Sequence, residues 1–390
     1  MKRKVCVLTA TRAEYGLFKP LLSRILSHPS LELRLLVTGT HLSAEHGHTI
    51  DEILADGFKP DECVEIPLAG DSDLNVARSM SLALARVADA LSGLEPDVLV
   101  LLGDRYETLA AAAAASILRI PIAHIHGGET TEGAYDEAFR HSISKMSHLH
   151  FVAAPVYRDR VIQLGEDPER VFDVGSLGVE NVLSLARLTR SETEERLGLK
   201  LLEKSLVVTF HPVTLEPNES LKQLDELLQA LDALEDTSLI FTAPNADNEG
   251  RRLAAALETF CARHPHARLY ESLGQTLYFS CVAHSDGVVG NSSSGISEAP
   301  ALGTGTVNVG DRQKGRLRVP SIIDCAPRKS PILAALERLY APEFRALVQS
   351  TSDSFRHENV SATIAERLAA ANLRDILKKR FFDIPVPSEY

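Results

Sequence analysis

Residues 287–298 read Gly-Val-Val-Gly-Asn-Ser-Ser-Ser-Gly-Ile-Ser-Glu: a short apolar run, a loop of small polar residues and a helix-like start. Small residues let the backbone come close to a ligand, and free N–H groups at a helix start bind anions such as phosphate. Taken alone, an ordinary strand–loop–helix connection capped by a serine explains the stretch equally well. The stretch therefore predicts one β–loop–α unit and makes its loop a candidate phosphate site.

The same rhythm continues along nearly the whole chain. Apolar runs of strand length alternate with helix-like segments, which is typical of an α/β protein with parallel sheets. The runs are continuously apolar, as expected for strands that are covered on both faces. The candidate strands are residues 5–10, 33–38, 98–102, 120–125, 149–153, 206–210, 238–242, 287–289 and 306–309. Between Arg105 and Leu118, an alanine-rich segment predicts a helix that lies close against the sheet.

The order of these elements predicts two Rossmann-like, doubly wound domains. Their ligand cleft is expected where the carboxyl ends of the two sets of strands face one another. We expect an N-terminal domain with the catalytic acids at 1–175 and a nucleotide-binding domain at 176–365. A helical segment at 366–390 is expected to pack back on the N-terminal domain, within a longer helix-like stretch at 355–382. Residues 173–183 are the hinge candidate.

Composition excludes several classes of protein. The chain has 390 residues, is 44% hydrophobic and 24% charged, and carries a formal net charge of -12, which argues against a nucleic-acid partner. Its five cysteines are scattered and show no C-x-x-C pair, which favours a reducing compartment and argues against a zinc site. No apolar run reaches the roughly 18 residues of a membrane span, so we expect a cytoplasmic protein.

Carboxylates and histidines gather in the first half, after candidate strands or at a predicted helix start. They are Asp104, His126, Glu129, Asp136 and Glu137. Two or three acids in one cleft would supply a base and an acid with separated pKa values. Four of the five also have a structural explanation: an N-cap for Asp104 and Asp136, a solvated loop acid for Glu129, and a hydrogen-bonded core imidazole for His126. A metal site at His124, His126 and Glu129 is the weaker hypothesis, because the pattern places no third ligand firmly.

Basic and small polar residues are the candidates for binding a diphosphate and its ribose. They are Arg12, Arg105, His211, Asn245, Ser292, Ser293, Ser294, Arg312 and, for a sugar diol, Glu298. Arginine can bind phosphate through two parallel hydrogen bonds, and Arg12 precedes a helix start expected around Tyr15. An alternative for Arg105 is pairing with Asp104 or Glu107 on its own segment. The chain has neither a P-loop nor a Gly-x-Gly-x-x-Gly after its first strand, which argues against a kinase and a dehydrogenase.

Six motifs now stand in one order along the chain. They are Thr-Ala-Thr-Arg-Ala-Glu-Tyr-Gly at 9–16, Leu-Gly-Asp-Arg-Tyr-Glu at 102–107, His-Ile-His-Gly-Gly-Glu at 124–129, Asp-Glu-Ala-Phe-Arg-His-Ser-Ile-Ser-Lys-Met at 136–146, Gly-Asn-Ser-Ser-Ser-Gly at 290–295 and Gly-Asp-Arg-Gln-Lys-Gly-Arg at 310–316. Over roughly its full length the chain resembles the hydrolysing UDP-N-acetylglucosamine 2-epimerases of sialic-acid synthesis and their relatives in legionaminic-acid synthesis.

The resemblance implies the glycosyltransferase-B arrangement, a nucleotide-sugar substrate, a homodimer and no cofactor. It also implies a reaction in which the C2 proton and the nucleoside diphosphate are eliminated to give a 2-acetamidoglycal. Water then adds with the opposite configuration at C2. By matching motif, Arg12, Arg105, His211, Ser292, Ser293, Glu298 and Arg312 would hold the nucleotide. Asp104, Glu129 and Asp136 would carry the proton transfers, with Glu137 as a further candidate.

One position departs from the family pattern. Some relatives read His-Ile-Glu-Gly-Gly-Glu where this chain has His126, and its segment between Glu129 and Asp136 is one residue longer than in some of them. The acting group at this corner is therefore either His126 or Glu129, and the sequence favours Glu129.

Three other functions stay open at this point. A non-hydrolysing 2-epimerase would return a nucleotide-linked product, and a glycosyltransferase would pass the sugar to an acceptor. A catalytically silent nucleotide-sugar sensor would bind without turnover. The sequence does not tell UDP from GDP, or N-acetylglucosamine from a 2,4-diacetamido-6-deoxy sugar.

Overall fold

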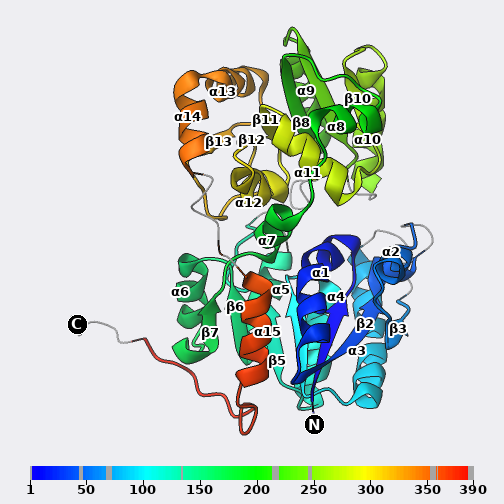
Figure 1. The fold of residues 1–390 in the computed structure, drawn as a ribbon, viewed down its shortest axis with the longest axis vertical. Helices are drawn as coiled ribbons and strands as arrows, with labels where there is room; N and C mark the ends of the chain where they lie inside the picture. The colour runs from blue at the N-terminus through cyan, green and yellow to red at the C-terminus, as the bar shows by residue number, and fades with distance from the viewer. Residues whose placement is uncertain are drawn as a thin grey trace. The chain divides into compact units, whose positions relative to one another are not determined.

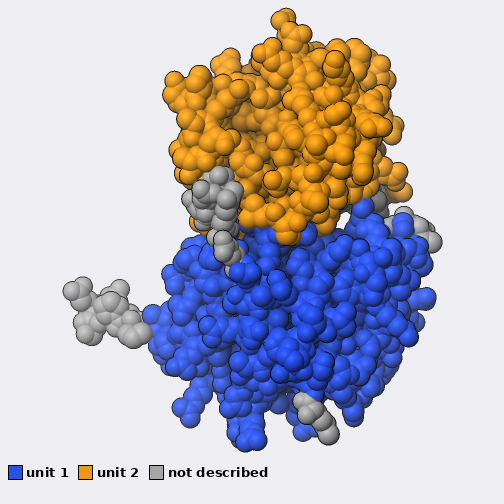
Figure 2. Space-filling model, viewed as in Figure 1, with its two compact units in different colours: residues 1–129, 136–181, 357–390 blue, residues 130–135, 182–356 orange. Residues whose placement is uncertain are grey.

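The computed structural model describes residues 2–43, 47–66, 73–132, 135–212, 219–244, 248–351, 357 and 359–384 (Figure 1). It divides into two compact units, which Figure 2 shows in separate colours. Unit 1 comprises residues 1–129, 136–181 and 357–390, and unit 2 comprises residues 130–135 and 182–356. The C-terminal residues thus belong to the same unit as the N-terminal ones. The domain boundaries at 175 and 365 inferred from the sequence stay a prediction.

Unit 1 is built on a parallel sheet with seven strands among its described residues, in the order β3-β2-β1-β4-β5-β6-β7. Their bounds are Glu62–Val64 (β3), Leu31–Thr38 (β2), Arg3–Thr9 (β1), Val98–Leu102 (β4), Ile122–Ile125 (β5), Leu149–Val152 (β6) and Val171–Asp173 (β7). The helices are α1 Arg12–Ser27, α2 Ile50–Ala55, α3 Asp73–Leu94, α4 Tyr106–Ile117, α5 Asp136–Met146, α6 Pro155–Gln163 and α15 Val360–Ala370, while α7 Leu177–Ser184 crosses the division between the units. The order reverses between β1 and β4, the switch point of a doubly wound sheet.

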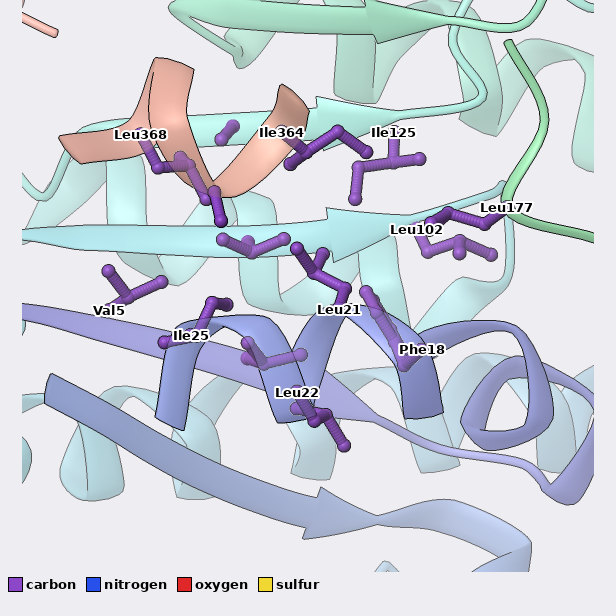
Figure 3. Packing of buried hydrophobic residues seen from close by; sticks show 14 of the residues in the cluster. Val5, Phe18, Leu21, Leu22, Ile25, Leu102, Ile125, Leu177, Ile364 and Leu368 are labelled. Carbon is purple, nitrogen blue, oxygen red and sulfur yellow. The ribbon is translucent and has the colours of Figure 1, made fainter. Parts of the chain in front are cut away.

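Both faces of this sheet are covered, as its continuously apolar strands predict. Along β1, Val5 and Val7 face a core with α1 and α15, while Cys6 and Leu8 face a second core with α3 and α4. Figure 3 shows the first core, where Phe18 and other side chains of α1 lie against the strands together with those of α15. The alanine-rich α4 is buried along most of its length, which confirms the helix expected close to the sheet.

Unit 2 repeats the same topology. Its parallel sheet has six strands among the described residues, in the order β10-β9-β8-β11-β12-β13. The strands are Ala267–Tyr270 (β10), Thr237–Thr242 (β9), Lys204–Thr209 (β8), Gly287–Gly290 (β11), Gly305–Val309 (β12) and Ile322–Cys325 (β13). The helices are α8 Arg190–Leu197, α9 Ser220–Leu231, α10 Asn248–Cys261, α11 Gly274–His284, α12 Ser293–Ala301, α13 Lys329–Tyr340 and α14 Pro342–Thr351. The predicted fold class, two doubly wound α/β domains, is confirmed.

Two helix predictions need correction. The first helix begins at Arg12 rather than around Tyr15, because the Thr11 side chain accepts the N–H of Glu14 and Glu14 accepts the N–H of Thr11 in a capping box. The helix expected to run to 382 ends at Ala370. There the Asn372 side chain accepts the N–H of Arg374, a local bond that competes with helix continuation. Among the described residues, no helix is long and apolar enough to cross a membrane.

Candidate active site

An ion pair holds Asp104 just after the carboxyl end of β4. Arg140, on α5, donates a hydrogen bond to Asp104 Oδ2 and another to the carbonyl of His126 at 3.0 Å. Arg140 is only 3% exposed; although burial disfavours its charge, Asp104, Glu129 and Glu137 together raise its pKa. The N-cap of α4 is Arg105, so Asp104 is placed by Arg140 rather than by capping. Arg140 stands in the motif at 136–146, but the sequence analysis assigned it no role.

The carboxyl group of Asp136 has a raised pKa. It is the first residue of α5, which confirms the helix start inferred from the sequence. Burial, followed by the charge of Asp104, raises its pKa to about 6, although Arg105 and Arg140 act in the opposite direction. Two carboxyl groups thus meet at this edge, one paired with an arginine and one that holds its proton up to about pH 6. A carboxyl group with a raised pKa beside an arginine-paired carboxylate is an arrangement that suits an acid and a base in one site.

His126 and Glu129 form a second pair at the carboxyl end of β5. His126 Nδ1 lies 2.9 Å from Glu129 Oε1, and both side chains are about nine-tenths buried. The sharp turn behind them depends on Gly128, which has a φ of 78° and whose added Cβ would lie 2.4 Å from the Tyr157 carbonyl. Glu129 is therefore not a solvated loop acid. Glu137 lies on α5 with its Oε1 3.0 Å from Nε2 of His141.

His124 supports the loop that carries Asp104. Its Nε2 lies 2.8 Å from the Gly103 carbonyl and its Nδ1 lies 3.0 Å from Ser144 Oγ. Burial lowers its pKa to about 3, so the imidazole is neutral and donates to Gly103 from Nε2. Because both ring nitrogens are hydrogen-bonded within the protein, His124 acts as a structural support. No group of three metal-ligating side chains occurs in the part of the chain that the structure describes.

The two candidate arginines of the first half, Arg105 and Arg12, are each paired with a glutamate. Arg105 donates to both carboxylate oxygens of Glu107, at 3.2 and 3.1 Å, and not to Asp104. Arg12 lies 2.9 Å from Glu52 in an exposed ion pair. Glu14, a residue that the sequence analysis passed over, is buried in its capping box, and burial raises its pKa to about 7. The spacing Thr-x-x-Glu at 11–14 carried the signal.

In unit 2, Asn291 joins three loops at the carboxyl edge of the sheet. Its side chain accepts the N–H of His211 at 2.7 Å and donates to the His211 carbonyl at 2.8 Å. Its own carbonyl accepts from Arg312 at 3.1 Å and from Gln313 at 2.9 Å. Asn291 is fully buried, as is Gln313 almost entirely. Neither residue was a candidate from the sequence, although both lie in its six ordered motifs.

Part of the serine loop, residues 290–294, caps the N-terminus of α12. Ser292 is the N-cap of α12 and accepts the N–H of Ser294, as the structural explanation of this loop required; Ser293 begins the helix and Glu298 lies further along it. The loop starts at Gly290, whose added Cβ would lie 1.9 Å from the Thr209 carbonyl at a φ of 131°. Only glycine therefore allows β11 to run this close to β8.

One expectation in unit 2 changes in the structure, and another is not tested by it. His211 was counted among the basic candidates, but burial, together with the charge of Arg312, lowers its pKa to about 3. Its imidazole is neutral at physiological pH and can offer only a neutral hydrogen bond. Asn245 lies outside the described residues. The roles of the remaining residues in nucleotide binding stay predictions.

The fold and the edge of unit 1 define a doubly wound α/β protein with several carboxylates and histidines near the ends of parallel strands. The family model of UDP-N-acetylglucosamine 2-epimerase matches residues 23–369. The chain is 41% identical over 385 residues to the GDP/UDP-N,N'-diacetylbacillosamine 2-epimerase (hydrolyzing) of Campylobacter jejuni, with 98% of this chain and 100% of that protein covered. The chain therefore belongs to the UDP-N-acetylglucosamine 2-epimerase family.

Further similarities agree with this assignment. The chain is 39% identical to polysialic acid biosynthesis protein P7 of Escherichia coli, with 98% of each chain covered. It is 37% identical to the UDP-N,N'-diacetylbacillosamine 2-epimerase (hydrolyzing) of Legionella pneumophila, with 88% and 91% covered. The fold matches the crystal structure of UDP-GlcNAc 2-epimerase from Neisseria meningitidis bound to UDP-GlcNAc, with a TM-score of 0.81, 18% identity, and 94% and 99% of the chains covered.

Proposed function

We propose that this protein is a hydrolysing 2-epimerase that acts on a nucleotide-linked 2-acetamido sugar. It releases the free 2-epimer of the sugar and the nucleoside diphosphate. The observation that carries the proposal is the contrast between Asp104, paired with Arg140, and Asp136, whose pKa is raised to about 6. Inversion at C2 requires that a proton leave one face of the sugar and return to the other, so it needs at least two proton-transfer groups. The edge of unit 1 offers two sets, Asp104 with Asp136 and His126 with Glu129.

The chemistry proceeds in two balanced steps. In the first, a base removes the C2 proton, the C–H electrons form the C1–C2 double bond, and the C1–O electrons leave with the nucleoside diphosphate. In the second, Asp136 gives its proton to C2 from the other face while water adds its hydroxide to C1. Asp104, the other carboxylate of this set, takes the remaining proton of that water. Arg140 contacts both sets, through Asp104 Oδ2 and the His126 carbonyl.

We infer that the sugar is a 2,4-diacetamido-6-deoxy sugar linked to UDP or GDP. Support comes from the names of the relatives that are 41% and 37% identical, both hydrolysing N,N'-diacetylbacillosamine 2-epimerases. UDP-N-acetylglucosamine is the second candidate, because a UDP-N-acetylglucosamine 2-epimerase of Neisseria meningitidis is 32% identical over 338 residues. In either case the product would serve nonulosonic acid synthesis, in line with the polysialic acid relative.

We also infer that the enzyme is a cytoplasmic homodimer. The cytoplasm is supported by five cysteines that are all free of disulfides. The homodimer rests on the resemblance of the sequence motifs, and light scattering on the purified protein would measure it.

The test is a panel of nucleotide sugars incubated with the protein in deuterated water. We expect release of nucleoside diphosphate and of a free sugar with deuterium at C2, fastest for the diacetamido substrate. A nucleotide-linked product would indicate a non-hydrolysing epimerase, and turnover only with an added acceptor would indicate a glycosyltransferase. Nucleotide release without deuterium at C2 would contradict the proposal, and tight binding without turnover would indicate a sensor.

A further inference from the structure

The backbone of His126 is held in a conformation that few residues with a side chain adopt. Its φ is 65°, in the left-handed region, where such strain tends to occur at functional sites. Its N–H donates to the Phe151 carbonyl at 2.9 Å, and its carbonyl accepts from Arg140 at 3.0 Å. These two bonds, one to β6 and one to α5, fix the point from which the imidazole extends.

The two ring nitrogens of His126 have different surroundings. Nδ1 lies 2.9 Å from the carboxylate of Glu129 and therefore donates its proton to it. Nε2 is buried and has no hydrogen-bond partner among the residues that the structure describes. Buried polar atoms are nearly always paired, so an open one in a candidate active site calls for a ligand atom. His124, two residues earlier, differs because both its nitrogens are bonded within the protein.

We propose that His126 is the catalytic base of the elimination step and that Glu129 is its positioning residue. This inference rests on the proposed function and assigns the group that removes the C2 proton. Nε2 takes that proton with its lone pair, the C–H electrons form the C1–C2 double bond, and the nucleoside diphosphate leaves with the C1–O electrons. The imidazolium that results is stabilised by the buried carboxylate of Glu129 and passes its proton to solvent before the next turnover.

The charged and titratable groups around His126 fit this role. Glu129 faces its ring, Arg140 faces its carbonyl from α5, and the neutral His124 lies on β5. Because Arg140 is also paired with Asp104, its positive charge is compensated. The order of roles is the reverse of the one that the sequence favours, in which Glu129 itself transfers the proton.

The backbone conformation allows a sharp test by chemical rescue. Glycine adopts a positive φ without strain, so His126→Gly keeps the turn and leaves a space of the size of an imidazole. We expect this variant to lose C2 exchange in deuterated water by about 10²- to 10⁴-fold. Added imidazole should restore exchange in proportion to its concentration, and methylated imidazoles of different basicity should restore it at different rates. Asp104→Asn is the matched control, because added imidazole should not restore the C2 exchange that this variant loses.

Glu129 is tested through the same reaction. In Glu129→Gln the amide can donate to Nδ1 and so favour the wrong tautomer; the pH–rate profile should change shape as well as height. A structural role alone would lower the profile uniformly. The proposal fails if His126→Gly keeps near-wild-type exchange or if imidazole does not restore it. Absence of C2 deuterium in the wild-type product would instead overturn the proposed function, so the two failures are distinguishable.

Discussion

The two units share a topology but differ in what holds the carboxyl edges of their sheets. In unit 1 the edge carries pairs of ionisable side chains, Arg140 with Asp104 and His126 beside Glu129. In unit 2 the corresponding loops are joined by an uncharged amide, Asn291, with backbone groups and with Gln313. The same order of strands therefore supports a titrating edge in one unit and, in the other, an edge held mainly by the hydrogen bonds of uncharged groups. Topology determines where a site lies, and the loop residues determine its chemistry.

The largest expected effect is on the titrating edge. Asp104→Asn removes the carboxylate that Arg140 holds and should lower turnover by about 100-fold or more, with nucleotide affinity nearly unchanged. Steady-state kinetics and calorimetry with nucleoside diphosphate measure the two quantities. Asp159→Asn, an exposed change in the same unit, is the control. A loss of affinity as large as the loss of turnover would remove the contrast between the two units.

Substitution at the hydrogen-bonded edge of unit 2 should change the stability of that unit. Asn291→Ala removes two hydrogen bonds from a fully buried side chain and should lower the free energy of unfolding of unit 2 by about 2–3 kcal/mol. Urea denaturation measures the change, and Gln229→Ala on the exposed face of α9 is the control. An unchanged midpoint would show that Asn291 does not organise the three loops.

Nucleotide affinity should follow charge in unit 2. Arg312→Ala should weaken nucleoside diphosphate binding by about 1.5–3 kcal/mol, the range for a hydrogen bond to a charged group. His211→Gln should cost less, because burial keeps that imidazole neutral. Calorimetry on both variants tests the order. Equal affinity in both variants and in the wild type would show that neither residue binds the nucleotide.

The smallest effect expected is a shift in pH dependence. If protonated Asp136 serves the hydration step, wild-type turnover should fall as pH rises through about 6, because the acid loses its proton there. Asp104 helps to raise the pKa of Asp136. In the residual activity of Asp104→Asn, this fall in turnover, the alkaline limb of the pH–rate profile, should therefore move to lower pH. Burial, the larger cause, remains, and the shift should be partial. A limb that stays in place would show that the two carboxyl groups are not coupled.

Whether a strand was predicted from the sequence depended on its place in the sheet. The nine strands found from the sequence are the inner ones of the two sheets as the structure describes them. The four that were missed, β3, β7, β10 and β13, are the edges. Inner strands are covered on both faces and read as apolar runs, whereas an edge strand such as β3, Glu62–Val64, is short and mostly exposed. Edge strands form because a neighbour is already in place, and this information is not local in sequence.

The candidate site divides in a similar way. Asp104, His126 and Asp136 were found because each follows a strand or begins a helix, positions that sequence patterns reveal. Arg140 and Asn291 were not assigned, because a helical arginine and a loop asparagine look ordinary until their partners are known. The neutral state of His211 was also hidden, since burial is a property of the folded chain. Residue types and positions were readable, whereas pairing and proton state required coordinates.

The position of α15 has a consequence for how the chain is made. Its Ile364 and Leu368 complete the core beside α1, and Arg3 donates to the carbonyls of Leu368 and Ala371 (Figure 3). The first strand of unit 1 is thus completed by residues synthesised after the whole of unit 2. On the ribosome, unit 2 can close its core while the unit that began first still waits for its last helix. Vectorial synthesis therefore allows unit 2 to fold before unit 1 is complete, the reverse of the usual order in which N-terminal domains fold first.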